Sequence, residues 1–425
     1  MESDIEKRQE ERKNRRKQNK IIKILIIIAV SLVFVLVILR IADKVMAKDD
    51  EFSLDKGTKI DISYDDILVE PDEYPDRFEK PGGINVSYPK DGVKGIYMSP
   101  SGFSDGEIRE RNLALLEKSN LNAIVLDLKD DSGQVVSNIK SDNPLIEESM
   151  NVIYDIDETM NLFEEKNIYP IARIIVFRDN ILSYNHPEYS FKDENGDVWV
   201  RSNGDLFSNP FMKEVWDYNV DIAKAAAEAG FKEVQFDYIR YPEGFGNIHE
   251  KLDFNMGIYE GSNESLEELR VRSINEFLDY AKSELEPYGI KLGVDIFGYT
   301  TYVGEDVNIG QNFVDMAERV DVVSSMIYPS HWSPGNFGID YPDKEPYRLV
   351  DSYMEVEDSV LDNLDYPPIT RPWLQDFTAS YLQEGTYMEY GINEVLEQIK
   401  ALREHGVNEF LLWNAGNYYS ETEEY

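Results

Sequence analysis

The sequence of 425 residues contains no cysteine. Disulfides, zinc sites built on thiolates and cysteine nucleophiles are therefore excluded. Histidine is almost as scarce: the four residues His186, His249, His331 and His405 include no His-x-His or His-Glu-x-x-His spacing. A catalytic metal centre built on histidine is therefore not expected, and neither a metal nor another cofactor is predicted.

Basic residues are also few, with 43 Lys and Arg against 82 Asp and Glu. The first 40 residues hold 10 of the basic and 5 of the acidic residues. The rest of the chain thus has 33 basic and 77 acidic residues, a formal charge of −44. A body of this charge repels nucleic acid and anionic lipid, so neither is predicted as a partner.

One long apolar run, IIKILIIIAVSLVFVLVILRI, covers residues 21–41. About 20 apolar residues suffice to cross a bilayer, and Lys23 and Arg40 can reach the headgroups from near its two ends. Eight basic residues precede this segment within 20 positions, and four follow it. We therefore expect a single-pass anchor in the cell membrane with a cytoplasmic N-terminus and an extracytoplasmic body, or alternatively signal-peptide cleavage after Ala47.

The sequence from about 48 to 90 is acidic, is interrupted by proline and lacks a sustained helical or strand period. These features predict a stalk between the membrane and the next domain. The expected organisation is a cytoplasmic basic tail over 1–20, the transmembrane anchor over 21–41, an acidic extracytoplasmic linker over 42–91 and one large domain over 92–425.

From residue 95 onward, short apolar runs alternate with amphipathic segments of helical length. The expected strands are 95–99, 122–129, 169–177, 233–242, 290–299, 321–329, 369–377 and 409–416, and the expected helices are 107–119, 154–167, 212–230, 266–285, 312–320 and 392–406. Apolar strands that alternate with helices are typical of a parallel sheet covered on both faces. Eight such units predict an α/β fold of the closed (β/α)8 TIM barrel type, with long loops after the third, fourth and sixth strands.

The fourth expected strand, VQFDYIRYP, carries an acid where a packed strand should be apolar. Active sites of such barrels lie at the carboxyl ends of the strands, which face a solvated bowl. We therefore expect Asp237 to point into the barrel mouth near Arg240. A purely structural alternative is an ion pair of Asp237 with Arg240 or with Lys129.

Other strands also end in acids, amides and aromatic residues. The candidate substrate-binding residues are Asp127, Lys129, Asp130, Arg240, Tyr328, His331, Trp373, Gln375, Asp376 and Trp413. Paired carboxylates can divide the work of glycosidic cleavage, one protonating the leaving oxygen while the other attacks or activates water. Aromatic faces such as Trp332 can stack on sugar rings. Asp130 and Asp131 also fit a simple solvated turn.

The segments FSNP (207–210) and GFKEVQFDYIRYP (230–242) resemble a bacterial glycosyl hydrolase (β/α)8-barrel domain family, distantly similar to alpha-amylase-type glycosidases. Further motifs of this resemblance are KGIYMSPSG (94–102), AIVLDLKDDSG (123–133), GVDIFGY (293–299), MIYPSHW (326–332) and RPWLQDF (371–377). The resemblance covers about 94–420. It implies a catalytic carboxylate at the end of the fourth strand, which falls on Asp237.

In amylase-like barrels the general acid comes from the fifth strand and a third acid from the seventh. These places hold Asp295 and Asp376, although the fifth strand lacks the usual Glu, and Glu305 in the next loop is an alternative acid. The resulting hypothesis is a glycoside hydrolase that uses Asp237 and Asp295 on a cell-surface or extracellular polysaccharide. The alternatives are a non-catalytic glycan-binding barrel and a metal-dependent hydrolase built on Asp127, Asp130 and Asp237.

Overall fold

The computed structural model of the protein describes residues 83–425. The predicted transmembrane segment 21–41 and most of the predicted linker lie outside these residues. Between 83 and 425, no helix has the length and apolar character needed to cross a membrane.

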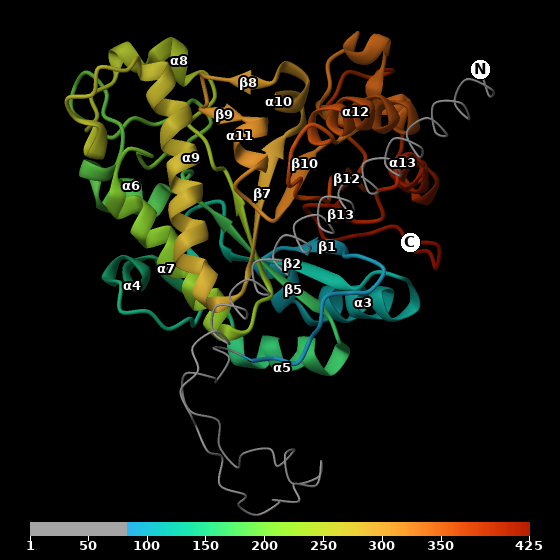
Figure 1. Ribbon diagram of the computed structural model, residues 1–425. Helices are drawn as coiled ribbons and strands as arrows, with labels where there is room; N and C mark the ends of the chain where they lie inside the picture. The colour runs from blue at the N-terminus through green and yellow to red at the C-terminus, as the bar shows by residue number, and fades with distance from the viewer. Residues whose placement is uncertain (1–82) are drawn as a thin grey trace, which may run out of the picture. The chain divides into compact units, whose positions relative to one another are not determined.

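Eight parallel strands form a closed barrel (Figure 1). They are β1 (Lys94–Met98), β2 (Ala123–Lys129), β5 (Tyr169–Ile175), β6 (Glu233–Asp237), β7 (Lys291–Phe297), β10 (Val322–Met326), β12 (Trp373–Gln375) and β13 (Phe410–Trp413). The ring closes because β1 pairs in parallel with both β2 and β13. The predicted (β/α)8 barrel is confirmed.

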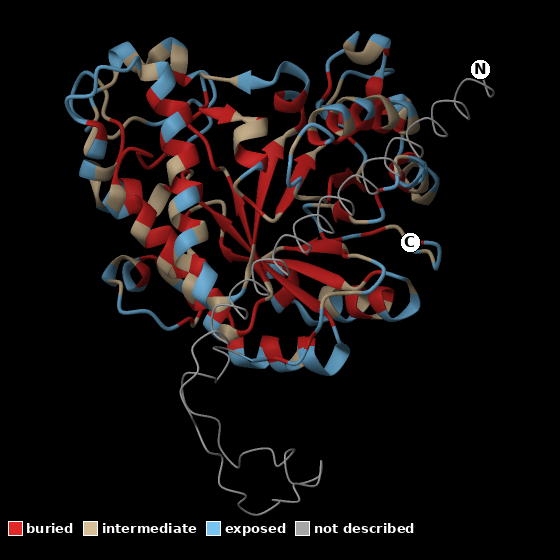
Figure 2. Ribbon diagram, viewed as in Figure 1, coloured by how far each residue is buried: buried red, intermediate tan, exposed pale blue. Residues whose placement is uncertain are grey.

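The strands form where the sequence predicts because they are buried on both sides. Every residue of β2 and β5 is buried, and Figure 2 shows the strands as a buried centre surrounded by helices whose outer faces are exposed. The seventh predicted strand is divided into β11 (Ile369–Thr370), which pairs with β10, and β12. Arg371 and Pro372 lie between the two pieces.

The six predicted helices are present as α3 (Gly106–Lys118), α5 (Ile156–Lys166), α7 (Lys213–Ala229), α9 (Leu266–Leu285), α11 (Phe313–Ala317) and α13 (Ile392–Glu404). Helix α7 ends at Gly230, whose φ of 116° places it in the left-handed region. A residue with a side chain is strained in that conformation, so glycine is favoured at this helix end.

After the sixth strand the sequence predicts a long loop and no helix, and there the structure differs. Helix α12 (Pro346–Leu361) packs against α13 and buries Leu349, Tyr353 and Leu361. Its apolar stripe is interrupted by the buried Glu357, which accepts hydrogen bonds from Ser325 (2.8 Å) and Tyr353 (2.6 Å). The buried face of α12 thus combines apolar residues with one hydrogen-bonded acid.

The remaining elements lie in the connections between barrel strands. They are α2 (Pro100–Ser104), β3 (Val135–Ser137), α4 (Pro144–Ser149), β4 (Met150–Tyr154), α6 (Asn180–Asn185), α8 (Phe245–Ile248), α10 (Gly298–Val303), β8 (Glu305–Asp306) and β9 (Gln311–Asn312). Short 3-10 turns, η3 (Pro187–Tyr189), η4 (His249–Lys251), η5 (Gly257–Tyr259), η6 (Glu286–Tyr288), η7 (Pro329–His331), η8 (Asn336–Gly338) and η9 (Pro342–Lys344), accompany them. Most of this material follows the carboxyl ends of β5, β6, β7 and β10, where it builds walls around the barrel mouth.

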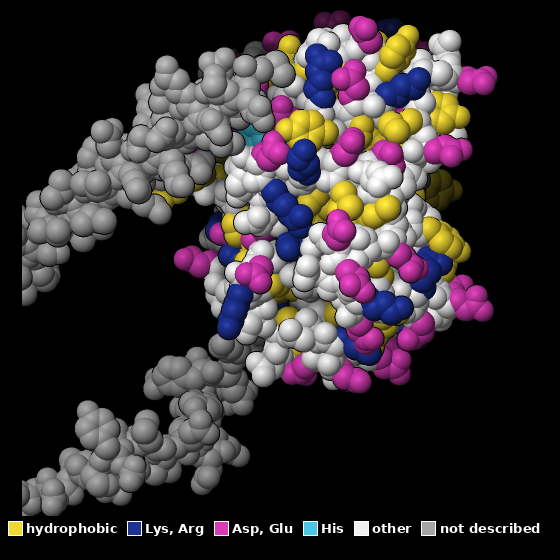
Figure 3. Space-filling view, turned by 90° about the vertical axis from the view of Figure 1, so that its right-hand side faces the viewer, with side chains coloured by type: hydrophobic (Ala, Val, Ile, Leu, Met, Phe, Trp, Pro, Cys, Tyr) yellow, Lys and Arg dark blue, Asp and Glu magenta, His cyan; other side chains and the backbone are white. Residues whose placement is uncertain are grey.

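On the face shown in Figure 3, Asp and Glu side chains are spread among Lys and Arg. They do not gather there into one large patch of a single charge.

Candidate active site

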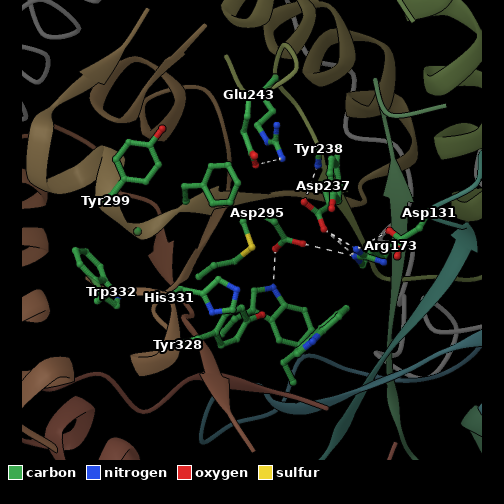
Figure 4. Close-up of a pocket in the computed structure, with 16 residues that line it drawn as sticks. Asp131, Arg173, Asp237, Tyr238, Glu243, Asp295, Tyr299, Tyr328, His331 and Trp332 are labelled. Atoms are coloured by element: carbon green, nitrogen blue, oxygen red, sulfur yellow. Dashed lines mark hydrogen bonds and ion pairs between the residues drawn. The ribbon is translucent and has the colours of Figure 1, made fainter. Parts of the chain in front are cut away.

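A cavity of about 510 Å³ opens at the carboxyl ends of the barrel strands (Figure 4). Acids, two arginines and aromatic rings line it together. The lining residues are Asp131, Arg173, Asp237, Tyr238, Arg240, Glu243, Asp295, Phe297, Gly298, Tyr299, Met326, Tyr328, His331, Trp332, Trp373 and Trp413. This is the end of the barrel where the sequence analysis places the functional residues.

Asp237 is the last residue of β6 and is held by three donors. Its Oδ2 accepts hydrogen bonds from Nη2 (2.6 Å) and Nε (3.1 Å) of Arg173. Its Oδ1 accepts one from the backbone N–H of Tyr238 at 2.6 Å. Tyr238 has a φ of 50°, which is rare for an aromatic residue and ends the strand at this point. The predicted strand therefore ends five residues early, and the carboxylate is fixed in one orientation.

Asp295, on the neighbouring strand β7, has a different environment. Its Oδ1 accepts a hydrogen bond from Nε1 of Trp373 at 2.7 Å, and its Oδ2 lies 4.0 Å from Nε of Arg173. Burial, and secondly the negative charge of Asp237, raise the pKa of Asp295 well above its ordinary value, against the opposing effects of Arg173 and Trp373. Asp295 can therefore hold a proton at a pH where an exposed aspartate is ionised.

Arg173 joins the acids of the site and was not among the predicted residues. Besides Asp237, its guanidinium contacts Asp127 through Nη1 at 2.7 Å and Asp131 through Nη2 at 3.4 Å. It lies within the buried apolar strand β5, where an unpaired charge would be costly. Like Asp237 on β6, Arg173 is a charged residue in a strand that the sequence predicts to be buried. This signal in the sequence could have identified it.

Asp127 is buried behind the cavity wall, and it is not a lining residue. Its Oδ2 accepts a hydrogen bond from the hydroxyl of Tyr97 at 2.7 Å, while its Oδ1 faces Arg173. Burial raises the pKa of Asp127 to about 6. Its contacts orient Arg173, and the contact of Asp127 with substrate stays a prediction.

Lys129 and Asp130 also lie outside the cavity lining. Lys129 has no exposed surface, and its Nζ pairs with Asp179 at 2.6 Å and donates to Asn219 at 2.9 Å. Asp130 accepts hydrogen bonds from the backbone N–H groups of Ser132 and Gln134, as the turn alternative expects. Neither position supports substrate contact, and the alternative pairing of Lys129 with Asp237 is wrong.

Arg240 lines the cavity and pairs with Glu243 at 3.2 Å. Its guanidinium lies between the rings of Tyr238 (4.8 Å from the centroid) and Phe297 (4.6 Å). The direct ion-pair partner of Asp237 is thus Arg173 and not Arg240. Arg240 is buried in the cavity wall, with its planar group against two rings.

The two polar residues of the seventh strand are turned away from the cavity. Gln375 is buried, donates to Asp343 at 2.9 Å and accepts from the backbone N–H of Ser330 at 3.0 Å. Asp376 accepts from the backbone N–H and the hydroxyl of Ser420, both at 2.8 Å, and burial raises its pKa to about 6. Neither residue is among those that line the cavity, and substrate contact for both stays a prediction.

The candidate acids Asp376 and Glu305 are therefore both absent from the cavity wall. Glu305 is an exposed residue of β8. Of the three acids considered for the proton donor, only Asp295 lies in the cavity.

The other predicted binding residues, Tyr328, His331, Trp373 and Trp413, do line the cavity. Trp413 stacks on Tyr97 with 4.2 Å between ring centroids, and Trp373 meets Trp413 edge to face at 5.5 Å. Burial lowers the pKa of His331, which favours the neutral imidazole. Of the nine lining residues outside the predicted set, six are aromatic or acidic: Asp131, Tyr238, Glu243, Phe297, Tyr299 and Trp332.

Between residues 83 and 425, no group of three or more His, Asp and Glu side chains is arranged to hold a metal ion. Asp127 and Asp237, two members of the metal-site alternative, instead share the guanidinium of Arg173. Asp130 faces its own turn.

Two of the solved structures similar to this chain share its fold at low identity. The glycoside hydrolase domain of PgaB (BpsB) from Bordetella bronchiseptica is 14% identical with a TM-score of 0.51, and the match covers 76% of this chain and 94% of that one. The beta-galactosidase of Marinomonas ef1 is also 14% identical, with a TM-score of 0.52, and 76% of this chain matches 54% of that one.

A third similar structure, a hypothetical protein from Ruminiclostridium thermocellum ATCC 27405, is 33% identical over 47% of this chain and 96% of its own, with a TM-score of 0.40. No curated protein sequence matches the chain. The sequence model of one family, described as "putative glycosyl hydrolase domain", matches residues 95–419, which is nearly the whole barrel. The chain belongs to this glycosyl hydrolase domain family.

Proposed function

We propose that the barrel is a glycoside hydrolase that cleaves a cell-surface or extracellular polysaccharide with Asp237 and Asp295. One observation carries the proposal: two carboxyl groups in different environments line a single cavity walled by aromatic rings. Three hydrogen bonds from cationic and backbone donors hold the carboxyl group of Asp237 in place. Burial and the neighbouring negative charge favour the protonated form of Asp295.

In the proposed reaction, Asp295 gives its proton to the glycosidic oxygen as the bond from that oxygen to the anomeric carbon breaks. The hydrogen bond from Trp373 occupies Oδ1 of Asp295, so the proton belongs on Oδ2. Asp237 either attacks the anomeric carbon or takes a proton from the attacking water. If Asp237 attacks, Asp295 regains its proton from the water that then cleaves the glycosyl–enzyme bond. If Asp237 instead takes a proton from the attacking water, Asp237 loses that proton to solvent and Asp295 takes one up from solvent before the next cycle. In both cases water supplies the hydroxyl of one product.

The rest of the cavity suits a sugar. Trp373, Trp413 and Tyr328 offer apolar faces, while His331 and Arg240 offer groups that hydrogen-bond with hydroxyls. The apolar run over 21–41, if it spans the membrane as its sequence predicts, would keep this barrel at the cell surface. A polysaccharide there is the substrate class that this position favours.

The test compares the full-length wild type with Asp237→Asn on purified bacterial cell-wall and exopolysaccharide preparations and a panel of α- and β-glycans. New reducing ends are counted. We expect release by the wild type and its loss in Asp237→Asn. Asp130→Asn is the matched control, because it makes the same change at an acid outside the cavity and should keep activity.

A non-catalytic glycan-binding barrel is the second candidate, because the aromatic wall would serve it equally well. It predicts that wild type and Asp237→Asn bind the same glycan and that neither releases reducing ends at any pH. That outcome would refute the hydrolase proposal.

A further inference from the structure

Aromatic residues continue beyond the cavity along one side of its rim. Helix α10 directly follows β7 and carries Tyr299, which lines the cavity, and Tyr302. Residues three positions apart lie on the same side of a helix, so Tyr302 extends the line of Tyr299 by one turn. Tyr302 is 53% exposed.

A second connection reaches Tyr302 from the next loop. The ring of Trp332 lines the cavity and lies 5.0 Å from that of Phe337, which in turn lies 5.3 Å from the ring of Tyr302. The ring planes are inclined at 51° and 73°, so these rings do not cover one another face to face. Trp332, Phe337 and Tyr302, here called the aromatic arm, form a continuous line from the cavity to solvent.

Figure 4 shows where this line begins. Tyr299 and Trp332 lie at one side of the cavity, away from Asp131 and Arg173. The aromatic arm therefore leaves the cavity on the side away from the charged cluster around Arg173.

The backbone at Phe337 supports a role beyond packing. Within residues 83–425, four residues other than glycine have positive φ: Asn167, Tyr238, Phe337 and Asn417. Asparagine tolerates this conformation, whereas an aromatic residue in it is unusual and needs support from its surroundings. Of the two aromatic cases, Tyr238 lies beside the catalytic candidate Asp237, and Phe337, with a φ of 52°, is the middle ring of the aromatic arm.

The loop around Phe337 is held in place by its neighbours. The backbone N–H of Gly335 donates to the carbonyl of Ile339 at 2.8 Å, and Nη2 of Arg348 donates to the carbonyl of Gly338 at 3.0 Å. A rigid loop thus presents a strained aromatic residue between a cavity ring and an exposed ring. Rigid aromatic side chains are efficient binding groups because they lose little conformational entropy.

We propose that the aromatic arm binds sugar rings of the substrate that lie outside the cavity, so that the substrate is a chain much longer than the cavity holds. This inference rests on the proposed function. A cavity of about 510 Å³ is of the size that encloses one drug-sized ligand, so a polysaccharide must continue past its rim. The aromatic arm provides apolar surface where such a chain would leave.

The test measures how binding depends on chain length. The glycan of the panel that the wild type binds most tightly is partly hydrolysed by acid and fractionated into fragments of short (two-ring) and long (eight-ring) average length. Affinities of both fractions are measured for Asp237→Asn, so that no cleavage occurs, alone and combined with Tyr302→Ala or with Phe337→Gly. We expect each added substitution to weaken binding of the long fraction by about tenfold and to leave the short fraction unchanged.

Tyr366→Ala is the matched control. Tyr366 is 90% exposed and precedes β11, so it lies toward the amino-terminal end of the barrel, away from the cavity. Equal loss for both fractions, no loss for the long one, the same loss in Tyr366→Ala, or the absence of any bound glycan would overturn the proposal.

The two proposals can fail separately. If the wild type releases no reducing ends but the arm variants lose affinity only for long chains, the aromatic arm stands and hydrolysis does not. If the wild type hydrolyses glycans and the variants bind long chains normally, hydrolysis stands and the aromatic arm does not.

Discussion

The interior of the barrel contains two clusters of an arginine with carboxylates, one at each end. At the amino end, Arg371 pairs with Glu233 at 2.6 Å and with Glu409 at 2.9 Å. At the carboxyl end, Arg173 pairs with Asp127 at 2.7 Å and with Asp237 at 2.6 Å. Strand β6 contributes to both, with Glu233 as its first residue and Asp237 as its last.

Both clusters combine an arginine with carboxylates, but their arginines differ in access. The side chains of Arg371 and Glu233 are 0% exposed, and the hydroxyl of Tyr88 fills a further contact of the arginine at 3.1 Å. Arg173 and Asp237, in contrast, line the cavity. The same ion-pair chemistry therefore closes one end of the barrel and is available to a ligand at the other. Access, which depends on the loops, distinguishes a structural cluster from a candidate catalytic one.

The largest expected effect comes from replacing an acid by its amide at either end of β6, in two separate variants. Asp237→Asn should lower turnover by about 10³-fold while the protein stays folded, because Arg173 keeps Asp127 as its partner. Glu233→Gln should lower the free energy of unfolding by about 3–5 kcal/mol, because it removes one partner of a fully buried pair. Reducing-end assays and urea unfolding measure the two quantities.

We also expect Glu233→Gln to leave the turnover per folded molecule unchanged. The contrary result is a fully folded Glu233→Gln whose turnover falls as far as that of Asp237→Asn. It would show that the two ends of the barrel do not differ as a structural and a candidate catalytic cluster.

A smaller effect is expected when each arginine is replaced by lysine, which keeps the positive charge but lacks the planar guanidinium. Arg173→Lys cannot reach Asp127 and Asp237 together as the guanidinium does, so kcat should fall by about 10²-fold. Arg371→Lys should lower Tm with kcat unchanged. Steady-state kinetics and thermal unfolding measure kcat and Tm of both variants. Equal losses of kcat would show that the amino-end cluster also acts on the chemistry.

The smallest expected effect is on the pH profile of kcat/KM. Burial and the charge of Asp237 raise the pKa of Asp295, so its protonated, active form persists at low pH and activity is lost as pH rises through that raised pKa. The N–H of Trp373 stabilises the ionised form, so Trp373→Phe should move this alkaline limb to higher pH. Glu233→Gln should move the limb only slightly, and toward lower pH, because the negative charge of Glu233 contributes less to the raised pKa of Asp295 than burial or the charge of Asp237 does. A limb that does not move in Trp373→Phe would exclude Asp295 as its origin.

The barrel could be predicted from the sequence because each strand is an apolar run and most helices have a regular period. Individual contacts could not, because they depend on how the ring closes. Arg173 meets Asp237, 64 positions away, and Lys129 at the end of β2 meets Asp179 in the connection after β5. No spacing in the chain specifies these pairs.

The positions of some residues of the candidate site could be predicted from the sequence, and those of others could not. Asp237, Asp295 and the aromatic residues at the strand ends lie where the barrel pattern places them. For Gln375 and Asp376 the pattern was insufficient, because β12 has only three residues and the local backbone turns both side chains toward neighbouring loops. A short strand offers too little alternation to predict which face a residue occupies.

The closure of the barrel also determines when the cavity can form. Strand β13, close to the C-terminus, pairs with β1, and its Trp413 stacks on Tyr97 of that first strand to build one wall. Contacts so distant in sequence form slowly, because a long loop must close before they contribute stability. During synthesis on the ribosome, all the other strands emerge before this wall exists. A nascent chain that lacks β13 therefore does not yet have this wall, and the cavity can be completed only after β13 has paired with β1.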